Sequence, residues 1–312
     1  MGMVMNTSAV SSKKIVEAAG NELPLGPAIF SIFLSILFGA NAVAVKISLH
    51  GLGVFTTAGL RFGLAAIAIS LWAIGTGRSL RINRAQAGQL AILSLFFMGQ
   101  IALFYLGLNL TTASHGTLIG NLQPFVVLLL AHYFIPGDRI TRRKIIGITL
   151  GFCGVLAVVL DKPQVAVDIR LGDLYTFFGV LIWGTSAVYV KRLSRTIHPV
   201  IISLYPMFPA VPCFLLAGYI FDGEMVRYVD TSIVAALLYQ AFVTASFGFI
   251  AWNTMIKRYG ATALHSFVFV MPVAGVFFGV VLLGEPVTSH LLVAIGLIAA
   301  GIVVINGRKK VI

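Results

Sequence analysis

The chain contains a succession of apolar segments of about twenty residues, and this feature leaves very few folds open to it. A helix needs about 20 predominantly apolar residues to cross the hydrocarbon core of a bilayer. Ten segments meet that requirement: 27–47, 56–75, 87–110, 113–135, 144–161, 172–191, 200–221, 232–256, 261–283 and 290–306. They are continuously apolar rather than alternating, which excludes membrane-spanning β-strands. We therefore predict an all-α integral membrane protein with ten transmembrane helices.

The composition agrees with a chain that is embedded in lipid. Of the 312 residues, 59% are hydrophobic and only 10% are charged. Soluble domains carry about 25% charged residues, so this chain lacks the polar surface that a water-soluble globule needs. Residues 1–26 are polar and hold no apolar core before a small-residue cleavage site. We expect a short cytoplasmic tail there rather than a secretory signal peptide.

Lysine and arginine residues are concentrated in every second connection between the predicted spans. The rich set is Lys13, Lys14, Arg78, Arg81, Arg84, Arg139, Arg142, Arg143, Lys144, Lys191, Arg192, Arg195, Lys257, Arg258, Arg308, Lys309 and Lys310. The opposite side holds Lys46, Lys162, Arg170 and Arg227. Because cytoplasmic loops are enriched in Lys and Arg, both termini are predicted to be cytoplasmic. The formal net charge of +12 follows from this topology, so nucleic-acid binding is not expected.

The two halves of the chain resemble each other at a nearly constant spacing. Residues 38–46 match 183–191, residues 113–124 align with 261–272, and 137–141 match 284–288. Chance similarity between apolar helices is the alternative, but ordered matches of Gly, Pro, Lys and acidic residues are hard to produce by composition alone. Five helices per copy make the second copy enter from the opposite face. The sequence thus predicts two inverted five-helix repeats, 27–161 and 172–307, with a substrate site near the midplane and alternating access.

Several short motifs resemble the repeat pattern of the EamA family of the drug/metabolite transporter superfamily. They are 105–113 with Pro124 and Gly137-Asp138 in the first half, and Gly284-Glu285-Pro286 with Gly296 and Gly301 in the second. The resemblance covers residues 27–307, and one departure is that the first copy carries Asp138 where the family has Glu. It implies ten helices, cytoplasmic termini, a central cavity and a multi-pass location in a bacterial inner (plasma) membrane. Similar members export amino acids, aromatic ones among them, and other small metabolites.

Polar residues inside the predicted spans are candidates for a substrate site, because a polar group in lipid is costly unless it has partners or water. On span 113–135 the residues Ser114, Thr117 and Asn121 share a face with Pro124, and the matching face of span 261–283 ends at Pro272. The predicted substrate-binding residues are Asn41, Gln100, Thr117, Asn121, Trp183, Ser186, Ser246, Asn253, His265 and Phe269. The alternative for each is a contact between helices. Pro124 and Pro272 are predicted hinges, since proline inside a helix removes a backbone hydrogen bond.

Arg61 and His265 each have two interpretations. Arg61 lies near the outer end of span 56–75, and we favour snorkelling of its guanidinium to the surface over binding of a substrate carboxylate. His265 could carry a proton, since imidazole titrates near neutrality, although a structural hydrogen bond is the commoner role. All 10 acidic residues are expected in the tail, in loops or at helix ends. Without a carboxylate in the middle of the membrane, we expect facilitated diffusion rather than ion-coupled pumping.

The sequence leaves other functions open. A carrier of nucleosides, polyamines or phosphorylated metabolites is an alternative, although a phosphate site would call for several deep cations and only Arg61 and Lys46 approach that position. An intramembrane enzyme needs a nucleophile–base pair or a metal cluster, and no such pattern is visible. A channel needs a filter segment, which is also not visible. We expect no catalytic residue, metal ligand or cofactor, and as partners a small-molecule substrate and the lipid bilayer. A homodimer is left open.

Overall fold

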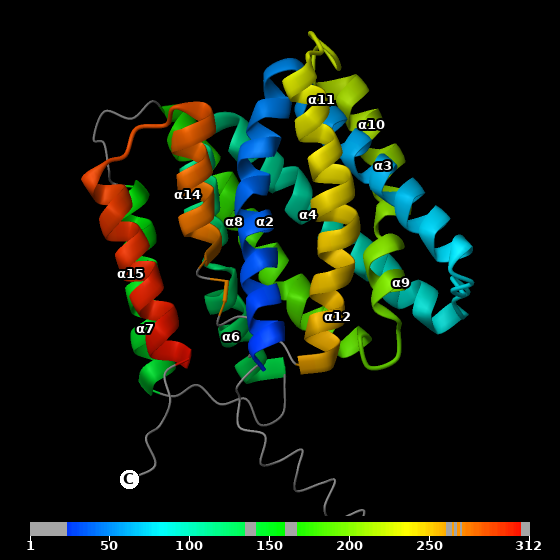
Figure 1. The fold of residues 1–312 in the computed structure, drawn as a ribbon, viewed down its shortest axis with the longest axis horizontal. Helices are drawn as coiled ribbons and strands as arrows, with labels where there is room; N and C mark the ends of the chain where they lie inside the picture. The colour runs from blue at the N-terminus through cyan, green and yellow to red at the C-terminus, as the bar shows by residue number, and fades with distance from the viewer. Residues whose placement is uncertain are drawn as a thin grey trace, which may run out of the picture.

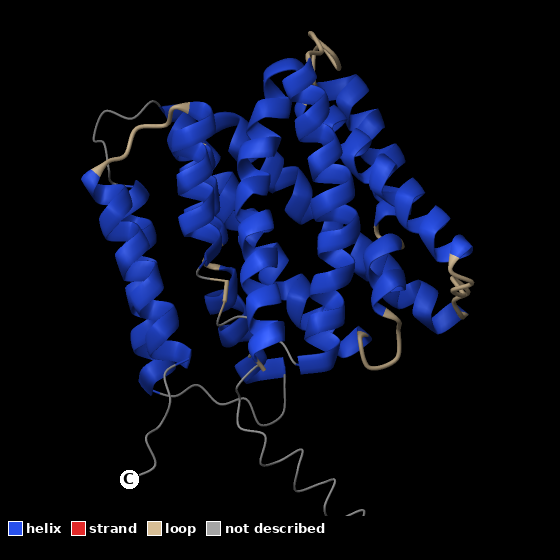
Figure 2. Ribbon diagram, viewed as in Figure 1, coloured by secondary structure: helices blue, strands red, loops and turns tan. Residues whose placement is uncertain are grey.

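The protein, in a computed structural model that describes residues 24–134, 142–159, 167–259, 264, 267–268 and 270–306, is built of helices that pack side by side (Figures 1 and 2). The first half contains α2 (Leu25–Gly51), α3 (Val54–Gly75), α4 (Arg84–Leu110), α5 (Ala113–Gly120), α6 (Gln123–Phe134) and α7 (Arg142–Val159). The second half contains α8 (Val167–Leu193), α9 (Pro199–Leu204), α10 (Met207–Phe221), α11 (Thr231–Leu238), the π-helix η1 (Tyr239–Gly248), α12 (Phe249–Tyr259), α14 (Val270–Leu283) and α15 (Ser289–Asn306).

Many of these helices have the length and composition of membrane spans. Six stretches of the described residues are long and apolar enough to cross a bilayer: Leu25–Gly51, Val54–Gly75, Arg84–Leu110, Arg170–Leu193, Pro199–Phe221 and Thr231–Tyr259. Shorter apolar helices lie at Val270–Leu283 and in parts of α7 and α15. The chain is therefore a multi-pass membrane protein, as its apolar segments predict.

The helix predicted at 113–135 is not continuous, which is a correction to the sequence analysis. It is divided into α5 and α6 by a turn at Asn121–Leu122. Pro124 has no N–H and cannot donate to the carbonyl of Gly120. Tighter i→i+3 bonds form in its place, from Asn121 N to Leu118 O at 3.1 Å and from Leu122 N to Ile119 O at 2.9 Å.

A similar interruption precedes the second predicted hinge. Val270 N donates to Phe267 O at 3.1 Å and Met271 N donates to Val268 O at 2.9 Å, just before α14 continues through Pro272. Pro124 and Pro272 thus lie in the first turn of a helix, where proline is well tolerated. The prediction that they sit in the middle of their helices was wrong, because α6 begins at Gln123 and α14 begins at Val270.

Two further predicted spans deviate from straight α-helices. The span at 200–221 consists of α9 and α10, which meet at Tyr205–Pro206. The span at 232–256 contains the ten-residue π-helix η1 between α11 and α12. π-Helical segments are uncommon and are frequently found at functional sites.

The helices pack in four principal pairs: α4 with α8, α7 with α15, α3 with α10, and α2 with α14. Figure 1 shows α7 and α15 side by side at one edge of the bundle, with α3 and α10 toward the opposite edge. Small residues allow the close approaches, as is usual between membrane helices. A Cβ added to Gly107 of α4 would lie 2.8 Å from the carbonyl oxygen of Gly172 in α8.

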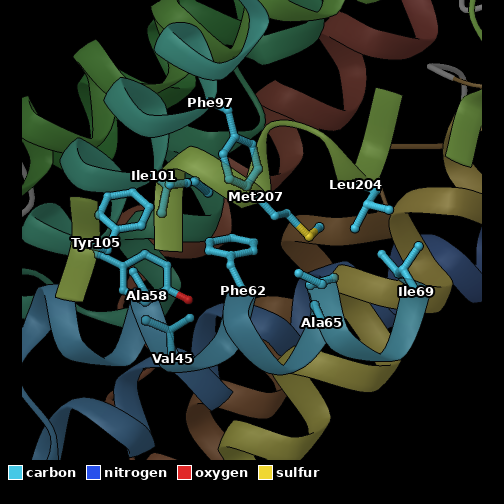
Figure 3. Close-up of a cluster of buried hydrophobic side chains, with 14 of the residues drawn as sticks. Val45, Ala58, Phe62, Ala65, Ile69, Phe97, Ile101, Tyr105, Leu204 and Met207 are labelled. Carbon is cyan, nitrogen blue, oxygen red and sulfur yellow. The ribbon is translucent and has the colours of Figure 1, made fainter. Parts of the chain in front are cut away.

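The largest apolar cluster lies where α2, α3, α4 and α10 meet. Figure 3 shows Phe62 surrounded by Phe97, Tyr105 and Met207. The ring centre of Phe62 lies 4.8 Å from that of Phe97 and 6.5 Å from that of Phe214. This cluster fixes the position of α3 against α4. It thereby also fixes the positions of the side chains that these two helices carry.

The connections between helices form two separate groups. In the first group the Tyr205 hydroxyl donates to Leu80 O at 2.6 Å, and Gln86 Nε2 donates to Thr196 O at 3.5 Å. In the second group Gly53 N donates to Met225 O at 3.0 Å. The first group comprises connections that are rich in Lys and Arg, and the second comprises connections that are poor in them.

Acidic side chains cap helix N-termini within the second group. Glu285 accepts from Ala113 N at 2.7 Å and from Ser114 N at 3.0 Å, and the Ser114 hydroxyl also donates to it. Asp222 accepts from Phe55 N at 3.0 Å and from Thr56 N at 2.8 Å. A carboxylate at this position satisfies otherwise unpaired N–H groups and interacts favourably with the helix dipole.

The prediction for Asp173 was also wrong, because this residue does not lie at the end of its helix. α8 begins at Val167, so Asp173 falls inside it and is only 4% exposed. Its carboxylate accepts from the Thr111 hydroxyl at 2.5 Å and lies 3.2 Å from Nδ1 of His115. Both partners adjoin the start of α5, so this carboxylate belongs to the same end of the bundle as Glu285.

Candidate functional site

A cavity of about 210 Å³ lies inside the bundle. A single water molecule needs roughly 10–15 Å³ on the same measure, so the cavity has room for a small organic molecule. Its walls come from α2, α3, α4, α5, α6, α8, α9, α12 and α14, and thus from both halves of the chain. A mostly apolar cavity with a few converging polar groups is typical of a small-molecule site.

Most of the predicted substrate-binding residues that the structure describes line this cavity. They are Asn41, Gln100, Thr117, Asn121, Trp183, Ser186 and Asn253. His265 and Phe269 lie outside the described residues. The structure therefore brings together side chains from five helices that the sequence singled out separately.

Ser246 and Ser114 are placed differently from the other candidates. The Ser246 hydroxyl donates to Ala241 O at 2.8 Å, a bond that spans five residues and follows from the π-helical geometry of η1. Ser246 is not among the lining residues, and its hydroxyl also approaches Ala65 O in α3 at 3.5 Å. Ser114 is occupied by its hydrogen bond to Glu285. For these two residues the structure favours the alternative interpretation, a contact between elements.

Arg61 lines the cavity and does not snorkel to the surface, which corrects the sequence analysis. It is only 3% exposed. Its Nη1 donates to the Tyr105 hydroxyl at 2.9 Å and its Nη2 donates to Thr244 Oγ1 at 3.1 Å. The guanidinium carbon also lies 4.8 Å from the ring centre of Phe62, within the range of a cation–π interaction. These contacts hold the side chain inward.

A hydrogen-bond network supports Arg61 from behind. The Tyr105 hydroxyl donates to Gln240 Oε1 at 2.9 Å, and Gln240 Nε2 donates to Ser48 Oγ at 2.7 Å. Thr244 Oγ1 lies 2.9 Å from Asn41 Oδ1, to which it can donate. Gln240 and Thr244 are both fully buried in η1. The π-helix thus supplies the residues that fix the guanidinium.

The side-chain oxygen of Asn121 is buried and has no hydrogen-bond partner among the described residues. Its Nδ2 donates to Thr117 O at 2.8 Å, so the amide nitrogen points back along α5. Oδ1 of Asn121, Oε1 of Gln100 and Nε of Arg61 are buried and have no hydrogen-bond partner among the described residues. Buried polar groups are nearly always paired, so three unpaired ones around one cavity point to a polar ligand.

Aromatic rings make up much of the remaining wall. The lining residues of this kind are Phe38, Phe97, Phe104, Trp183, Phe249 and Trp252. Phe38 and Trp252 meet edge to face, with ring centres 5.8 Å apart. Of these, the sequence predicted only Trp183 for the site. The others gave no signal, because an aromatic residue in an apolar span is equally suited to packing against lipid or protein.

The described residues provide neither a cluster of metal ligands nor a carboxylate in the cavity wall. No group of three His, Cys, Asp or Glu side chains is placed there to hold a metal ion. The lining residues include no carboxylate, and Arg61 is the one charged side chain among those that the structure describes. The cavity therefore has a positive wall at Arg61 and neutral polar groups elsewhere.

Comparison with known proteins agrees with this picture. The EamA-like transporter family matches residues 26–160 and 170–307. The uncharacterized transporter YyaM of Bacillus subtilis (strain 168) is 27% identical over 285 residues, which cover 89% of this chain and 92% of YyaM. A protein named as a probable amino-acid metabolite efflux pump in Escherichia coli (strain K12) is 25% identical over 284 residues, covering 88% of this chain and 92% of the pump. A crystal structure with 19% identity shares the fold, with a TM-score of 0.68 over 89% of this chain and 96% of the other.

Proposed function

Because this chain belongs to the EamA-like transporter family, we propose that it exports a small metabolite across the bacterial inner membrane, and that this metabolite is a neutral or aromatic amino acid. The observation that carries the proposal is the cavity. Its wall combines the Arg61 guanidinium, the amides of Gln100 and Asn121, and aromatic rings from both halves. An amino acid has a charged end and an apolar side chain, which this wall suits.

The proposed mechanism is alternating access by two inverted repeats, 27–161 and 172–307. Two observations support it. The interruption between α5 and α6 before Pro124 has a counterpart before Pro272, at the position that the sequence repeat aligns with it. The cavity also lies between helices of both halves. Discontinuous helices at the interface of inverted repeats are a recurring design of substrate sites in secondary transporters, so the two prolines are proposed hinges.

We propose the orientation with both termini in the cytoplasm. In Figure 1, α2 begins at the same end of the bundle at which α12 and α15 finish. The connections of residues 76–83 and 194–198 lie together and are rich in Lys and Arg. Such an excess marks the cytoplasmic side of membrane proteins.

We propose that transport is facilitative. The lining residues that the structure describes include no carboxylate that could carry a proton or bind Na⁺. The buried Asp173 is bonded to Thr111 and His115 at one end of the bundle, away from the cavity wall. The solute gradient is then the driving force.

A carrier of phosphorylated solutes is the second candidate, and Arg61 is the observation that favours it over the remaining alternatives. A buried guanidinium attracts anions and repels polyamines. A nucleoside is neutral and would leave the charge of Arg61 without a counterpart. The abundance of aromatic rings favours an amino acid over a phosphate ester.

Counterflow in proteoliposomes tests the proposal. Liposomes that contain the purified full-length protein are loaded with unlabelled L-phenylalanine, L-leucine, uridine, putrescine or glucose 6-phosphate, and entry of the labelled compound is followed. Protein-free liposomes are the control. We expect counterflow of the two amino acids without an imposed ion gradient. Counterflow of glucose 6-phosphate alone would replace the first candidate by the second, and no counterflow of any compound would contradict both.

A further inference from the structure

We infer that Arg61 is an anchor for the carboxylate of the transported solute, and that the amide oxygens of Gln100 and Asn121 receive its ammonium group. This inference rests on the proposed transport of amino acids. It adds which groups of the amino acid the site recognises. It assigns to Arg61 a role in binding rather than in packing.

Arg61 has no counterion among its partners in the described part of the chain. A buried charge is normally paired, because removing it from water is costly. Only 3% of the surface of Arg61 is exposed. The partners of Arg61 are two hydroxyl groups, on Tyr105 and Thr244, which are neutral. A solute carboxylate would supply the charge that the described protein does not.

The guanidinium of Arg61 has donors that the described residues do not use. Arginine has five N–H donors arranged in a planar fork that matches a carboxylate. Nη1 and Nη2 each make one hydrogen bond, and Nε makes none with the described residues. Because Tyr105 and Thr244 already hold the fork in place, little side-chain entropy is lost when an anion binds. The guanidinium is therefore preorganised as an anion receptor.

Two amide oxygens in the cavity wall complement the guanidinium as hydrogen-bond acceptors. Asn121 Oδ1 and Gln100 Oε1 are buried acceptors without a partner among the described residues, and both side chains line the same cavity as Arg61. The bond from Asn121 Nδ2 to Thr117 O keeps Oδ1 turned away from α5. An ammonium group has three donors and no acceptor. One cationic donor and two neutral acceptors thus match the carboxylate and ammonium of a zwitterion.

A comparison of three ligands on the wild-type protein tests this assignment directly. L-Phenylalanine, 2-phenylethylamine, which lacks the carboxylate, and 3-phenylpropanoate, which lacks the ammonium, are titrated into purified full-length protein in nanodiscs. We expect L-phenylalanine to bind best, 3-phenylpropanoate less well, and 2-phenylethylamine roughly ten- to a hundred-fold more weakly than L-phenylalanine. Equal affinity for L-phenylalanine and 2-phenylethylamine overturns the role of Arg61.

Variants locate the effect at Arg61. Arg61→Gln should lower the affinity for L-phenylalanine to that for 2-phenylethylamine, and Arg61→Lys should restore part of the difference. Arg78→Gln, which removes a guanidinium at the exposed end of α3, is the matched control and should behave as wild type. If Arg61→Gln keeps the full preference for the carboxylate, the assignment is wrong. If Arg61→Gln does not fold, the wild-type ligand comparison decides alone.

The outcomes also separate this inference from the proposed function. Counterflow of L-phenylalanine without any preference for the carboxylate would leave the transport function standing and overturn only the anchor. No binding and no counterflow of any of the three ligands would overturn both.

Discussion

The hydroxyl group of Tyr105 lies 2.9 Å from Nη1 of Arg61, although 44 positions separate the two residues in the chain. Tyr105 is fully buried in α4 and does not line the cavity, whereas Arg61 does. The phenol therefore holds Arg61 in place without lining the cavity itself. It accepts a hydrogen bond from the guanidinium and donates one to Oε1 of Gln240 in η1.

Tyr105→Phe should weaken solute binding without removing a group that touches the solute. The change leaves an N–H of Arg61 and the side-chain oxygen of Gln240 unpaired in a buried site, at a cost of about 1–3 kcal/mol. We expect a higher KM for L-phenylalanine, a smaller change in maximal rate and a lower Tm. Kinetics in proteoliposomes and thermal unfolding of the same preparation measure these effects. Tyr219→Phe removes a hydroxyl from a side chain that is 79% exposed and is the control. An unchanged KM in Tyr105→Phe would show that Arg61 does not need this support.

Asn121→Ala should abolish most transport and leave the thermal stability nearly intact. Its Oδ1 has no partner to lose among the described residues, and its Nδ2 bonds only to the carbonyl of Thr117 one turn earlier. Loss of one buried hydrogen bond to the solute weakens binding by roughly ten- to a hundred-fold. If Asn121 instead stabilises helix packing, Tm falls and the transport rate per folded molecule stays the same. Both quantities should be measured on one purified variant.

Glu285→Gln should lower Tm, since the carboxylate accepts the N–H groups of Ala113 and Ser114 at the start of α5. A lost N-cap costs about 0.5–2 kcal/mol, which corresponds to a fall of a few degrees. Glu224→Gln, in the exposed loop after α10, is the matched control. A Tm equal to that of the wild type would mean that the amide oxygen caps α5 as well as the carboxylate does.

The protein should lose stability between neutral and mildly acidic pH through His198, which precedes α9. Burial lowers the pKa of His198 below its usual 6.5, and the positive charges of Lys257 and Arg78 lower it further. The neutral ring also accepts a hydrogen bond from Val200 N at 3.3 Å. Since the folded-state pKa is the lower one, this contribution is fully present above about pH 6.5 and is lost as the pH falls toward the folded-state value.

His198→Asn tests this pH dependence, because asparagine can still cap α9 but does not titrate. We expect the difference in Tm between pH 7.5 and pH 5.5 to be smaller in the variant than in the wild type. The same difference in both proteins would assign the acid sensitivity to other groups.

Pro124→Ala should slow turnover more than it weakens binding. Alanine restores the N–H that can bond to the carbonyl of Gly120 and so favours a continuous helix through the turn at Asn121–Leu122. Pro272→Ala should act in the same direction in the second half. Counterflow rates and equilibrium binding of L-phenylalanine separate the two effects. A maximal rate at the wild-type level in both variants would contradict the role of these prolines as hinges.

The apolar segments predicted the positions of the helices well, because length and hydropathy alone decide what can cross a membrane. The interruptions of the helices were harder to predict from the sequence. Pro124 and Pro272 indicated weak points, but whether a helix bends around a proline or ends before it depends on neighbouring helices. The π-helix η1 gave no recognisable pattern in residues 239–248.

The sequence found much of the cavity because polar residues in apolar spans are rare enough to be informative. Asn41, Gln100, Asn121 and Asn253 all line it. The same reasoning failed for Arg61, since the distance of a cation from a helix end does not tell whether the side chain points along the helix or across it. The hydroxyl groups of Tyr105 and Thr244 decide that direction, and both come from distant segments.

The end of α5 at Gly120 gives the cavity an electric field even when it is empty. Aligned peptide groups place a partial negative charge, up to about half an elementary charge, at the C-terminus of a helix. Gly120 and Asn121 lie there and line the cavity, and the fixed positive charge of Arg61 lies in the same wall. The zwitterion that we propose as the solute would be oriented by these two poles. The part of this field that comes from α5 belongs to the backbone, so no side-chain substitution at α5 can remove it.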